Sequence, residues 1–153
     1  MTQSGPFTIA PLWRRLAAMM YDSFLVIAIW IIVGFLVMSA FGIDQARTEN
    51  GVLRELSALH QNTLFAAMIV SAFLFFGWFW TNSGQTLGMQ AWRIKVQNAD
   101  GSAIGWEQVA LRFVTAPFSL ALCGLGYLLM LIDAEKRTVP DIVSKSQVVR
   151  VQL

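Results

Sequence analysis

Two long stretches without a charged residue constrain this chain more than any other feature. The first runs from Phe24 to Phe41, in an apolar run that begins after Trp13-Arg14-Arg15, and the second runs from Thr63 to Trp80. A helix rises about 1.5 Å per residue, so about 20 residues cross the roughly 30 Å hydrocarbon core of a bilayer. Each stretch therefore predicts a membrane-spanning helix. The first is too long for the apolar core of a signal peptide and precedes a second span, which favours a retained helix.

The composition excludes a water-exposed surface of ordinary kind. The 153 residues are 56% hydrophobic and 13% charged, with a mean hydropathy of +0.58, whereas soluble domains carry roughly 25% charged residues. The net charge is +2 and the isoelectric point is about 9.0. The basic residues stand in small groups beside apolar runs, which is typical of membrane topology signals and not of a nucleic-acid surface. The expected surroundings are therefore a lipid bilayer, and no nucleic-acid partner is expected.

A third apolar region, from Trp106 to Ile132, is less regular than the first two. Arg112 lies near its start, and Pro117, Gly124 and Gly126 interrupt it. The region could be one kinked spanning helix or two half-length helices that enter the membrane and return. Broken helices at membrane depth are tolerated only where protein covers the freed backbone groups. The basic tail after it favours the re-entrant form, because three simple spans would place that tail outside the cell.

The segment from Ser83 to Trp106 has strand and turn signals instead of a long apolar run. Residues 92–97 alternate apolar and polar side chains, and Asn98-Ala99-Asp100-Gly101 supplies turn chemistry. This pattern predicts a short strand-turn-strand flap on the membrane surface, with an irregular loop as the alternative for its second strand. A further short strand is predicted at residues 147–151, and the strand at residues 92–96 is the candidate for pairing with it.

The fold class that follows is an all-α integral membrane protein with two spanning helices, a third kinked or re-entrant helical segment and a small interfacial β-hairpin. We divide the chain into a cytoplasmic segment over residues 1–12, a transmembrane domain over residues 13–133 and a polar tail over residues 134–153. Counting basic residues places the N-terminus in the cytoplasm and the loop at residues 42–62, with an amphipathic segment, outside. The expected location is the bacterial inner (plasma) membrane.

Asp22 is the charged residue that a membrane helix would least be expected to carry. A carboxylate at a helix centre costs about 2.5–3.5 kcal/mol on insertion scales, so Asp22 should face protein and have a partner. Arg15 lies seven residues earlier on nearly the same helix face, and Arg112 could approach from the third apolar region. Two roles remain open: an ion pair that fixes helix register, or a site for an ion or proton.

Two other aspartates have simpler interpretations. Asp133 is followed by Lys136 and Arg137 at the i+3 and i+4 positions, which is typical of pairing at a helix end. Asp141 follows Pro140, and both residue types are favoured in the first turn of a helix. Asp141 could therefore mark the start of a short helix in the polar tail.

The sequence contains no pattern that predicts catalysis. Cys123 is the single cysteine and lies in an apolar stretch, so it has no disulfide partner and is expected to be a buried, inert thiol. No nucleophile motif, cluster of metal ligands or phosphate-binding loop stands in the context that its chemistry requires. We therefore expect no enzyme activity, no metal and no cofactor.

Three sequence motifs, taken together, resemble those of a known protein family. They are Trp13 to Asp22; Ser83-Gly84-Gln85-Thr86-Leu87-Gly88 with Arg93-Ile94-Lys95-Val96 and Asp100-Gly101; and Asp141 with Val148-Val149. They resemble the first helix, the central signature and the closing segment of the RDD family of membrane proteins, named for one arginine and two aspartates. The chain departs from that pattern at Met89-Gln90, Val139-Pro140 and Lys145-Ser146, where the family usually carries a basic pair, Leu-His and Gly-Thr.

The resemblance implies which residues to follow. Arg15, Asp22 and Asp141 correspond to the three residues of the family name, and we add Arg112 as a possible ion-pair partner. Secondary candidates come from the central signature and the end of the third apolar region: Gly84, Gln85, Thr86, Gly88 and Asp133.

Two functions are compatible with that resemblance, because some family members are linked to cation–proton exchange and others to recruiting partner proteins. The first is a small oligomeric transporter of a cation or proton in which Asp22 titrates. The alternative is a non-catalytic membrane adaptor or assembly protein in which the arginines and aspartates are structural. Either function would involve a homo-oligomer or another membrane protein.

Overall fold

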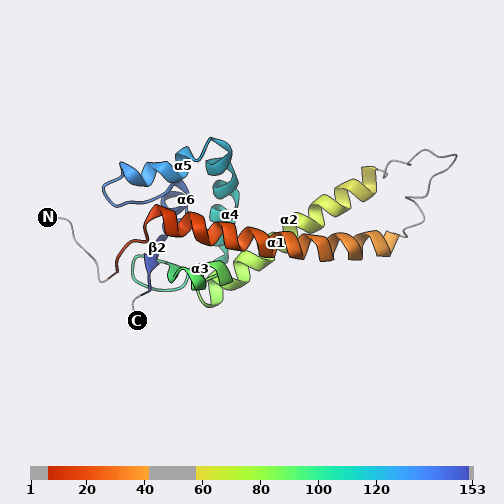
Figure 1. Ribbon diagram of the computed structural model, residues 1–153, viewed down its shortest axis with the longest axis horizontal. Helices are drawn as coiled ribbons and strands as arrows, with labels where there is room; N and C mark the ends of the chain where they lie inside the picture. Colours follow the sequence, from red (N-terminus) through yellow and green to blue (C-terminus); the bar gives the residue numbers. More distant parts are fainter. Residues whose placement is uncertain (1–6, 42–57, 152–153) are drawn as a thin grey trace. The chain divides into compact units, whose positions relative to one another are not determined.

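The computed structural model describes residues 7–41 and 58–151 of the chain (Figure 1). The predicted amphipathic segment in the 42–62 loop falls largely outside these residues. The chain forms two compact units, which are described separately. One unit comprises residues 24–75, and the other comprises residues 1–23 with residues 76–153.

The unit at residues 24–75 consists of the membrane-facing parts of two long helices. Helix α1 is Leu12–Phe41 and helix α2 is Ala58–Asn82. Both are long and apolar enough to cross a membrane, which confirms the two predicted spans. Their large apolar side chains are mostly exposed, as for Ile31 (68%) and Phe35 (67%). Exposed apolar surface of this extent is what lipid, not water, accommodates.

The other unit contains a two-stranded antiparallel sheet. Strand β1 is Ile94–Gln97 and strand β2 is Gln147–Arg150, with Ile94 opposite Arg150 and Gln97 opposite Gln147. This confirms the predicted pairing of the strand near residue 92 with the strand in the tail. On the other side of β2, Ile9 forms a bridge with Val149. The sheet therefore joins the segment before α1, the segment after α2 and the C-terminal tail.

The second strand predicted between Ser83 and Trp106 is absent from the structure. After the turn at residues 98–101, residues 102–105 have no strand partner, so the irregular-loop alternative holds there. The edge of β1 that a second strand of the flap would occupy is already used. Its Val96 amide donates to the Gly84 carbonyl (2.8 Å), and β2 covers the opposite edge. The two-stranded sheet is thus formed by strands 50 residues apart and not by a local hairpin.

The third apolar region forms a bent pair of helices. Helix α4 is Trp106–Ala121. Helix α5 (Leu125–Leu128) continues directly into the short helix η2 (Leu129–Leu131). The α5–η2 segment is inclined at 106° to α4. The bend lies at residues 122–124, where Gly124 adopts a positive φ of 75° that glycine tolerates best. Pro117 lies inside α4 and does not end it. Cys123, at the bend, is exposed, so the prediction of a buried thiol is wrong.

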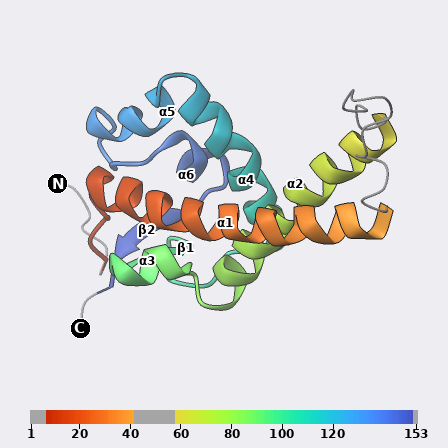
Figure 2. The same cartoon turned by 45° about the vertical axis from the view of Figure 1, so that its right-hand side comes forward.

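Short elements complete this unit. Helix α3 is Leu87–Ala91 and follows α2, while helix α6 is Val139–Val143 and precedes β2. Helix α6 packs mainly on α4. Figures 1 and 2 show the start of α1 surrounded by α3, the two strands and the α4–α6 segment. The core of the unit therefore forms around the first three turns of α1.

Two helical glycines differ sharply in the space around them, which yields a test of the packing. A Cβ at Gly77 would overlap the ring of Trp106, whereas a Cβ at Gly34 would meet only Leu64 Cδ1 at 3.9 Å. We expect Gly77→Ala to lower stability by about 1–2 kcal/mol through overpacking. Gly34→Ala should be neutral or stabilising, because alanine favours helix over glycine.

Thermal unfolding of both variants in detergent, followed by circular dichroism, measures the difference. A Gly77→Ala variant as stable as Gly34→Ala would contradict the close packing of Trp106 on α2.

Candidate functional site

Four charged side chains are buried among the residues that the structure describes. They are Arg15 (5% exposed), Asp22 (4%), Arg112 (7%) and Asp141 (1%). They come from α1, α4 and α6, and two positive charges balance two negative ones. Charged side chains are almost never fully buried unless they are paired. The four residues therefore form a candidate site, and each pairing has to be identified.

Asp141 lies between two arginines. Its Oδ2 accepts from Arg15 Nη1 at 2.5 Å and its Oδ1 accepts from Arg112 Nη1 at 2.7 Å. Oδ2 also accepts from the backbone amide of Thr138 (3.1 Å), the residue that precedes α6. Burial acts to raise the pKa of Asp141, but the guanidiniums of Arg112 and Arg15 outweigh it and hold that pKa below its usual value. Asp141 is therefore ionised at neutral pH.

Arg15 connects three segments that are far apart in the sequence. Besides Asp141, its Nε donates to the Ala10 carbonyl (3.1 Å) and its Nη2 donates to the Val148 carbonyl (3.2 Å). The planar guanidinium presents donors in a fixed fork, which allows one side chain to bind several acceptors. Arg15 thus ties α1 to the segment before it, to β2 and to α6.

Arg112 completes the environment of Asp141 from helix α4. Its Nη1 donates to Ser146 Oγ at 2.5 Å, and its guanidinium carbon lies 5.5 Å from the centre of the Trp80 ring. Ser144 Oγ is within hydrogen-bond distance of Ser146 Oγ (2.7 Å). The serine pair and Trp80 were not predicted from the sequence. A pair of serines in a polar tail carries no spacing signal that would have identified them.

Asp22 binds a different element. Its Oδ2 accepts from the Thr86 hydroxyl at 2.5 Å and its Oδ1 accepts from the Gly88 amide at 2.9 Å. The Thr86 hydroxyl oxygen in turn accepts from the Met89 amide at 3.1 Å, as an N-cap of α3 does. A Cβ at Gly88 would overlap the Ala18 carbonyl oxygen and lie 2.8 Å from Asp22 Oδ1. Glycine is therefore required where α3 approaches α1.

The predicted pairing of Asp22 with Arg15 or Arg112 is wrong. Among the described residues, both arginines form their ion pairs with Asp141, and the hydrogen bonds of Asp22 go to Thr86 and Gly88. Seven residues of helix separate Arg15 from Asp22 by about 10 Å along the axis. Helix α6 brings Asp141 to Arg15 directly, which leaves Asp22 free to bind α3.

The secondary candidates have structural positions. Gly84 has a φ of 71°, and a Cβ there would lie 2.6 Å from the Val96 carbonyl oxygen. Gln85 Nε2 donates to the Ile94 carbonyl (2.7 Å), so both residues fix the loop beside β1. Asp133 follows Ile132, the C-cap of η2, and accepts from the amide and from the Nε of Arg137 (2.9 and 3.3 Å). The predicted i+4 pairing with Arg137 at a helix end is thus present.

The contacts of the four buried charged residues are of the kind that hold structural elements together. Within residues 7–41 and 58–151, no three His, Cys, Asp or Glu side chains are grouped so that they could hold a metal ion. Every carboxylate oxygen of Asp22 and Asp141 accepts at least one hydrogen bond. Arg15, Arg112 and Asp141 form one cluster, and Asp22 with Thr86 and Gly88 forms a second cluster on the same helix.

Comparison with known proteins supports the motif resemblance. The model of the RDD family matches residues 9–145, which is most of the chain and includes all four buried charges. No curated protein and no solved structure matches.

Removal of the Asp141 carboxylate should be the most damaging single change at this site. Asp141→Ala leaves two buried guanidiniums facing each other, and breaking a buried ion pair in this way costs about 3–5 kcal/mol. The matched control is Asp133→Ala, which removes a carboxylate from a surface turn and should change stability little.

Thermal melting and the yield of monodisperse protein in detergent measure both variants. If Asp141→Ala melted within a degree or two of Asp133→Ala, the ion pairs of Asp141 would not hold the unit together.

Proposed function

Since the chain belongs to the RDD family, and since the buried charges of its site are used to join its elements, we propose that it is a non-catalytic membrane adaptor. The two spanning helices would anchor a folded unit at one face of the membrane, and that unit would dock a second protein. The observation that carries the proposal is the environment of Asp22, whose Oδ1 accepts from the Gly88 amide of α3 and whose Oδ2 accepts from the hydroxyl of Thr86, the N-cap of α3. The charge network then supports a docking unit and not a reaction.

Transport is the competing function, and it would require Asp22 to change its contacts during each cycle. A transport cycle would require its carboxylate to exchange a proton or cation. Hydrogen bonds to charged groups contribute roughly 1.5–3 kcal/mol each, and Asp22 accepts them from Thr86 and Gly88. Each turnover would weaken these two contacts and loosen α3 from α1. The structural role needs no such change, and for that reason we favour it.

The partner that we propose is another membrane protein or a second copy of this chain. The exposed side chains of α1 and α2 include small residues beside large apolar ones, and such helix faces associate in membranes through close packing.

The membrane topology that we propose follows from the sheet. Strand β2 binds β1, which follows α2, and it also binds residues 8–10, which precede α1. The tail is therefore on the same side as the start of α1 and the end of α2. The segment between β1 and β2 must then begin and end on that side, which supports the re-entrant form of the α4–η2 pair.

The orientation gains a clear charge difference from this arrangement. Nine of the eleven Lys and Arg residues lie outside residues 42–57, and Arg47 and Arg54 lie within that range. If the N-terminus, the β1 segment and the tail share one side, basic residues place that side in the cytoplasm by a wide margin. We propose this orientation in the inner membrane.

An ion-flux assay in proteoliposomes tests the adaptor proposal against transport. We expect wild-type protein to give the cation and proton flux of empty vesicles. Asp22→Asn keeps the shape of the side chain and its acceptor for Gly88, and its amide can donate to the Thr86 hydroxyl. It should therefore remain close to wild type in stability, whereas Asp22→Ala should lose both contacts and melt several degrees lower.

Flux above that of empty vesicles that disappears in well-folded Asp22→Asn protein would overturn the adaptor proposal. Equal loss of stability in Asp22→Asn and Asp22→Ala would instead show that the ionised carboxylate itself is needed at α3.

Cysteine labelling in intact cells tests the topology. In a Cys123→Ser background, we expect a membrane-impermeant maleimide to label Ala58→Cys in intact cells, and to label Ala99→Cys and Lys145→Cys only after permeabilisation. All three positions are exposed. Labelling of Lys145→Cys together with Ala58→Cys, with Ala99→Cys protected, would indicate three spans. Labelling of Ala99→Cys and Lys145→Cys alone would reverse the orientation but retain the re-entrant segment.

A further inference from the structure

Three arginines lie on segments that are distant in the sequence and are joined by hydrogen bonds near the start of α1. Arg14 Nη1 donates to the Trp92 carbonyl at 3.1 Å, and Trp92 is followed by Arg93. The Arg93 carbonyl accepts from the Val151 amide at 2.9 Å, and Val151 follows Arg150. These hydrogen bonds join the segments that carry the three arginines, and Arg150 pairs with Ile94, the residue after Arg93. We call Arg14, Arg93 and Arg150 the arginine patch.

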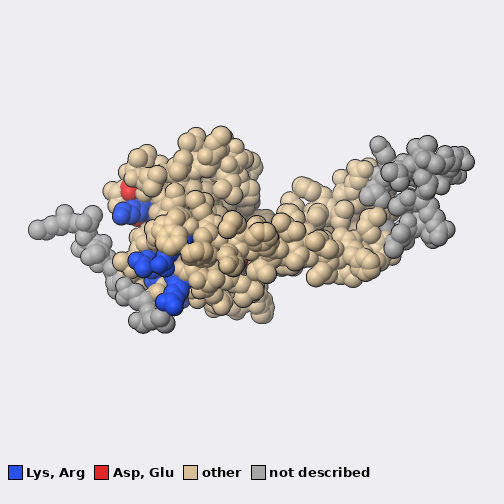
Figure 3. Space-filling view, viewed as in Figure 1, with Lys and Arg blue, Asp and Glu red and all other residues tan. Residues whose placement is uncertain are grey.

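The arginine patch has no acidic neighbour in an ion pair among the described residues. The ion pairs of the surface are elsewhere, where Arg137 binds Asp133 (3.3 Å) and Glu135 (3.0 Å). Figure 3 shows the same difference: Lys and Arg gather over β2 and the start of α1 without a visible acid, while the acid in view lies beside a separate basic group. The patch therefore presents uncompensated positive charge.

Arg93 has a backbone conformation that glycine adopts at lower cost than arginine. Arg93 is the residue after the C-cap of α3 and has a φ of 53°. Glycine is the usual residue there, since the left-handed region costs other residues conformational energy. Lys145 occupies the corresponding position after α6, with a φ of 52°. The conformation is thus not special to Arg93, but it allows glycine to replace either residue without backbone strain.

Aromatic side chains lie beside the arginine patch. The centres of the Trp13 and Trp92 rings are 5.4 Å apart and the rings are nearly perpendicular, and the centre of the Tyr21 ring lies 6.3 Å from that of Trp92. Trp13 and Tyr21 are about half exposed. Both belong to the first turns of a helix long and apolar enough to span the membrane. Trp and Tyr at such a position favour the depth of lipid headgroups.

We propose that the arginine patch binds the phosphate of an anionic phospholipid headgroup. Guanidinium groups match phosphate oxygens with paired donors, and the neighbouring aromatic rings set the patch at headgroup depth. A soluble acidic protein segment would meet the same positive charge but would gain nothing from Trp13 and Tyr21 facing lipid. This goes beyond the adaptor function, because the site requires no partner protein and its test requires none.

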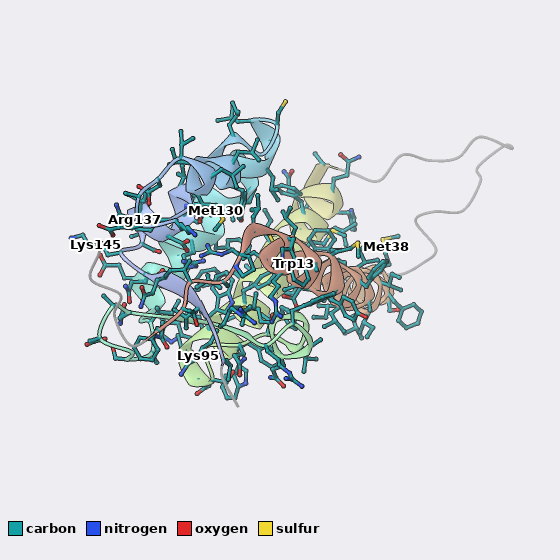
Figure 4. The ribbon with its side chains drawn as sticks, turned by 60° about the vertical axis from the view of Figure 1, so that its left-hand side comes forward. Trp13, Met38, Lys95, Met130, Arg137 and Lys145 are labelled. Carbon is teal, nitrogen blue, oxygen red and sulfur yellow. The ribbon has the colours of Figure 1, made fainter. Side chains whose placement is uncertain are left out.

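The variants that test the proposal use the strained position itself. Arg93→Gly removes the charge and relieves the backbone, so it should keep or raise the melting temperature while it weakens lipid binding. Lys145→Gly is the matched control: it has the same backbone conformation and charge, but it precedes β2, whereas Arg150 ends it. In Figure 4 the labels of Lys145 and Arg137 lie close together. Lys95, which is two positions after Arg93, is labelled apart from them.

The measurement is native mass spectrometry of the full chain from nanodiscs with equal amounts of phosphatidylglycerol and phosphatidylcholine. We expect wild type and Lys145→Gly to retain phosphatidylglycerol preferentially, Arg93→Gly to lose several-fold of that preference, and Arg14→Gln/Arg93→Gly/Arg150→Gln to lose roughly tenfold or more.

Equal retention of both lipids by wild type, or equal preference in Arg93→Gly and Lys145→Gly, would overturn the proposal. It would also fail if soluble glycerol phosphate displaced the lipid at equal concentration, or if a polyglutamate peptide bound the arginine patch more tightly than phosphatidylglycerol does. The result of this lipid-binding experiment does not depend on the results of the flux and labelling experiments, so the lipid proposal and the adaptor proposal can fail separately.

Discussion

The carboxylate of Asp141 between Arg15 and Arg112 is the interaction on which the folded unit depends. It joins α6 to α1 and α4, and Arg15 extends the connection to β2 and to the segment before α1. Apolar packing alone would hold these elements weakly beside a membrane, because lipid tails solvate apolar side chains as well as protein does. Directional ion pairs and hydrogen bonds remain effective there. The network therefore supplies the specificity that a soluble domain obtains from its core.

Asp22 performs the same task for a different element. A buried carboxylate next to a helix N-terminus satisfies free backbone amides and interacts favourably with the helix dipole. At α3 it does so across the chain, through Thr86 and Gly88, 64 and 66 residues away. The two aspartates and the arginine of the family name thus fix α6 and α3 at positions about two turns apart on α1. Their burial is explained by cohesion before any chemistry is assigned to them.

The sequence was sufficient for features that depend on local pattern. Uncharged runs located both spans, alternation located β1, and a short apolar segment in the tail located β2. Features that depend on the tertiary position of a residue could not be predicted from the sequence. The partner of Asp22 is a glycine amide and a threonine hydroxyl, and neither carries a charge that a search for ion pairs would find. The chain bends at Leu122–Gly124 and not at Pro117, because α4 tolerates the proline and Gly124 provides the positive φ. The sequence analysis proposed Arg112 as an ion-pair partner of Asp22, but in the structure Arg112 pairs with Asp141.

The placement of charge gives the chain two distinct layers. Each buried charge has a specific partner: Arg15 and Arg112 bind Asp141, and Asp22 accepts hydrogen bonds from Thr86 and Gly88, which offsets the cost of burial. The exposed basic residues have no such constraint, and at Arg93, Lys136 and Lys145 they occupy left-handed positions that glycine would adopt at lower cost. The buried charges therefore hold the fold together, whereas Arg93 and Lys145 can be replaced by glycine with their backbone conformation kept.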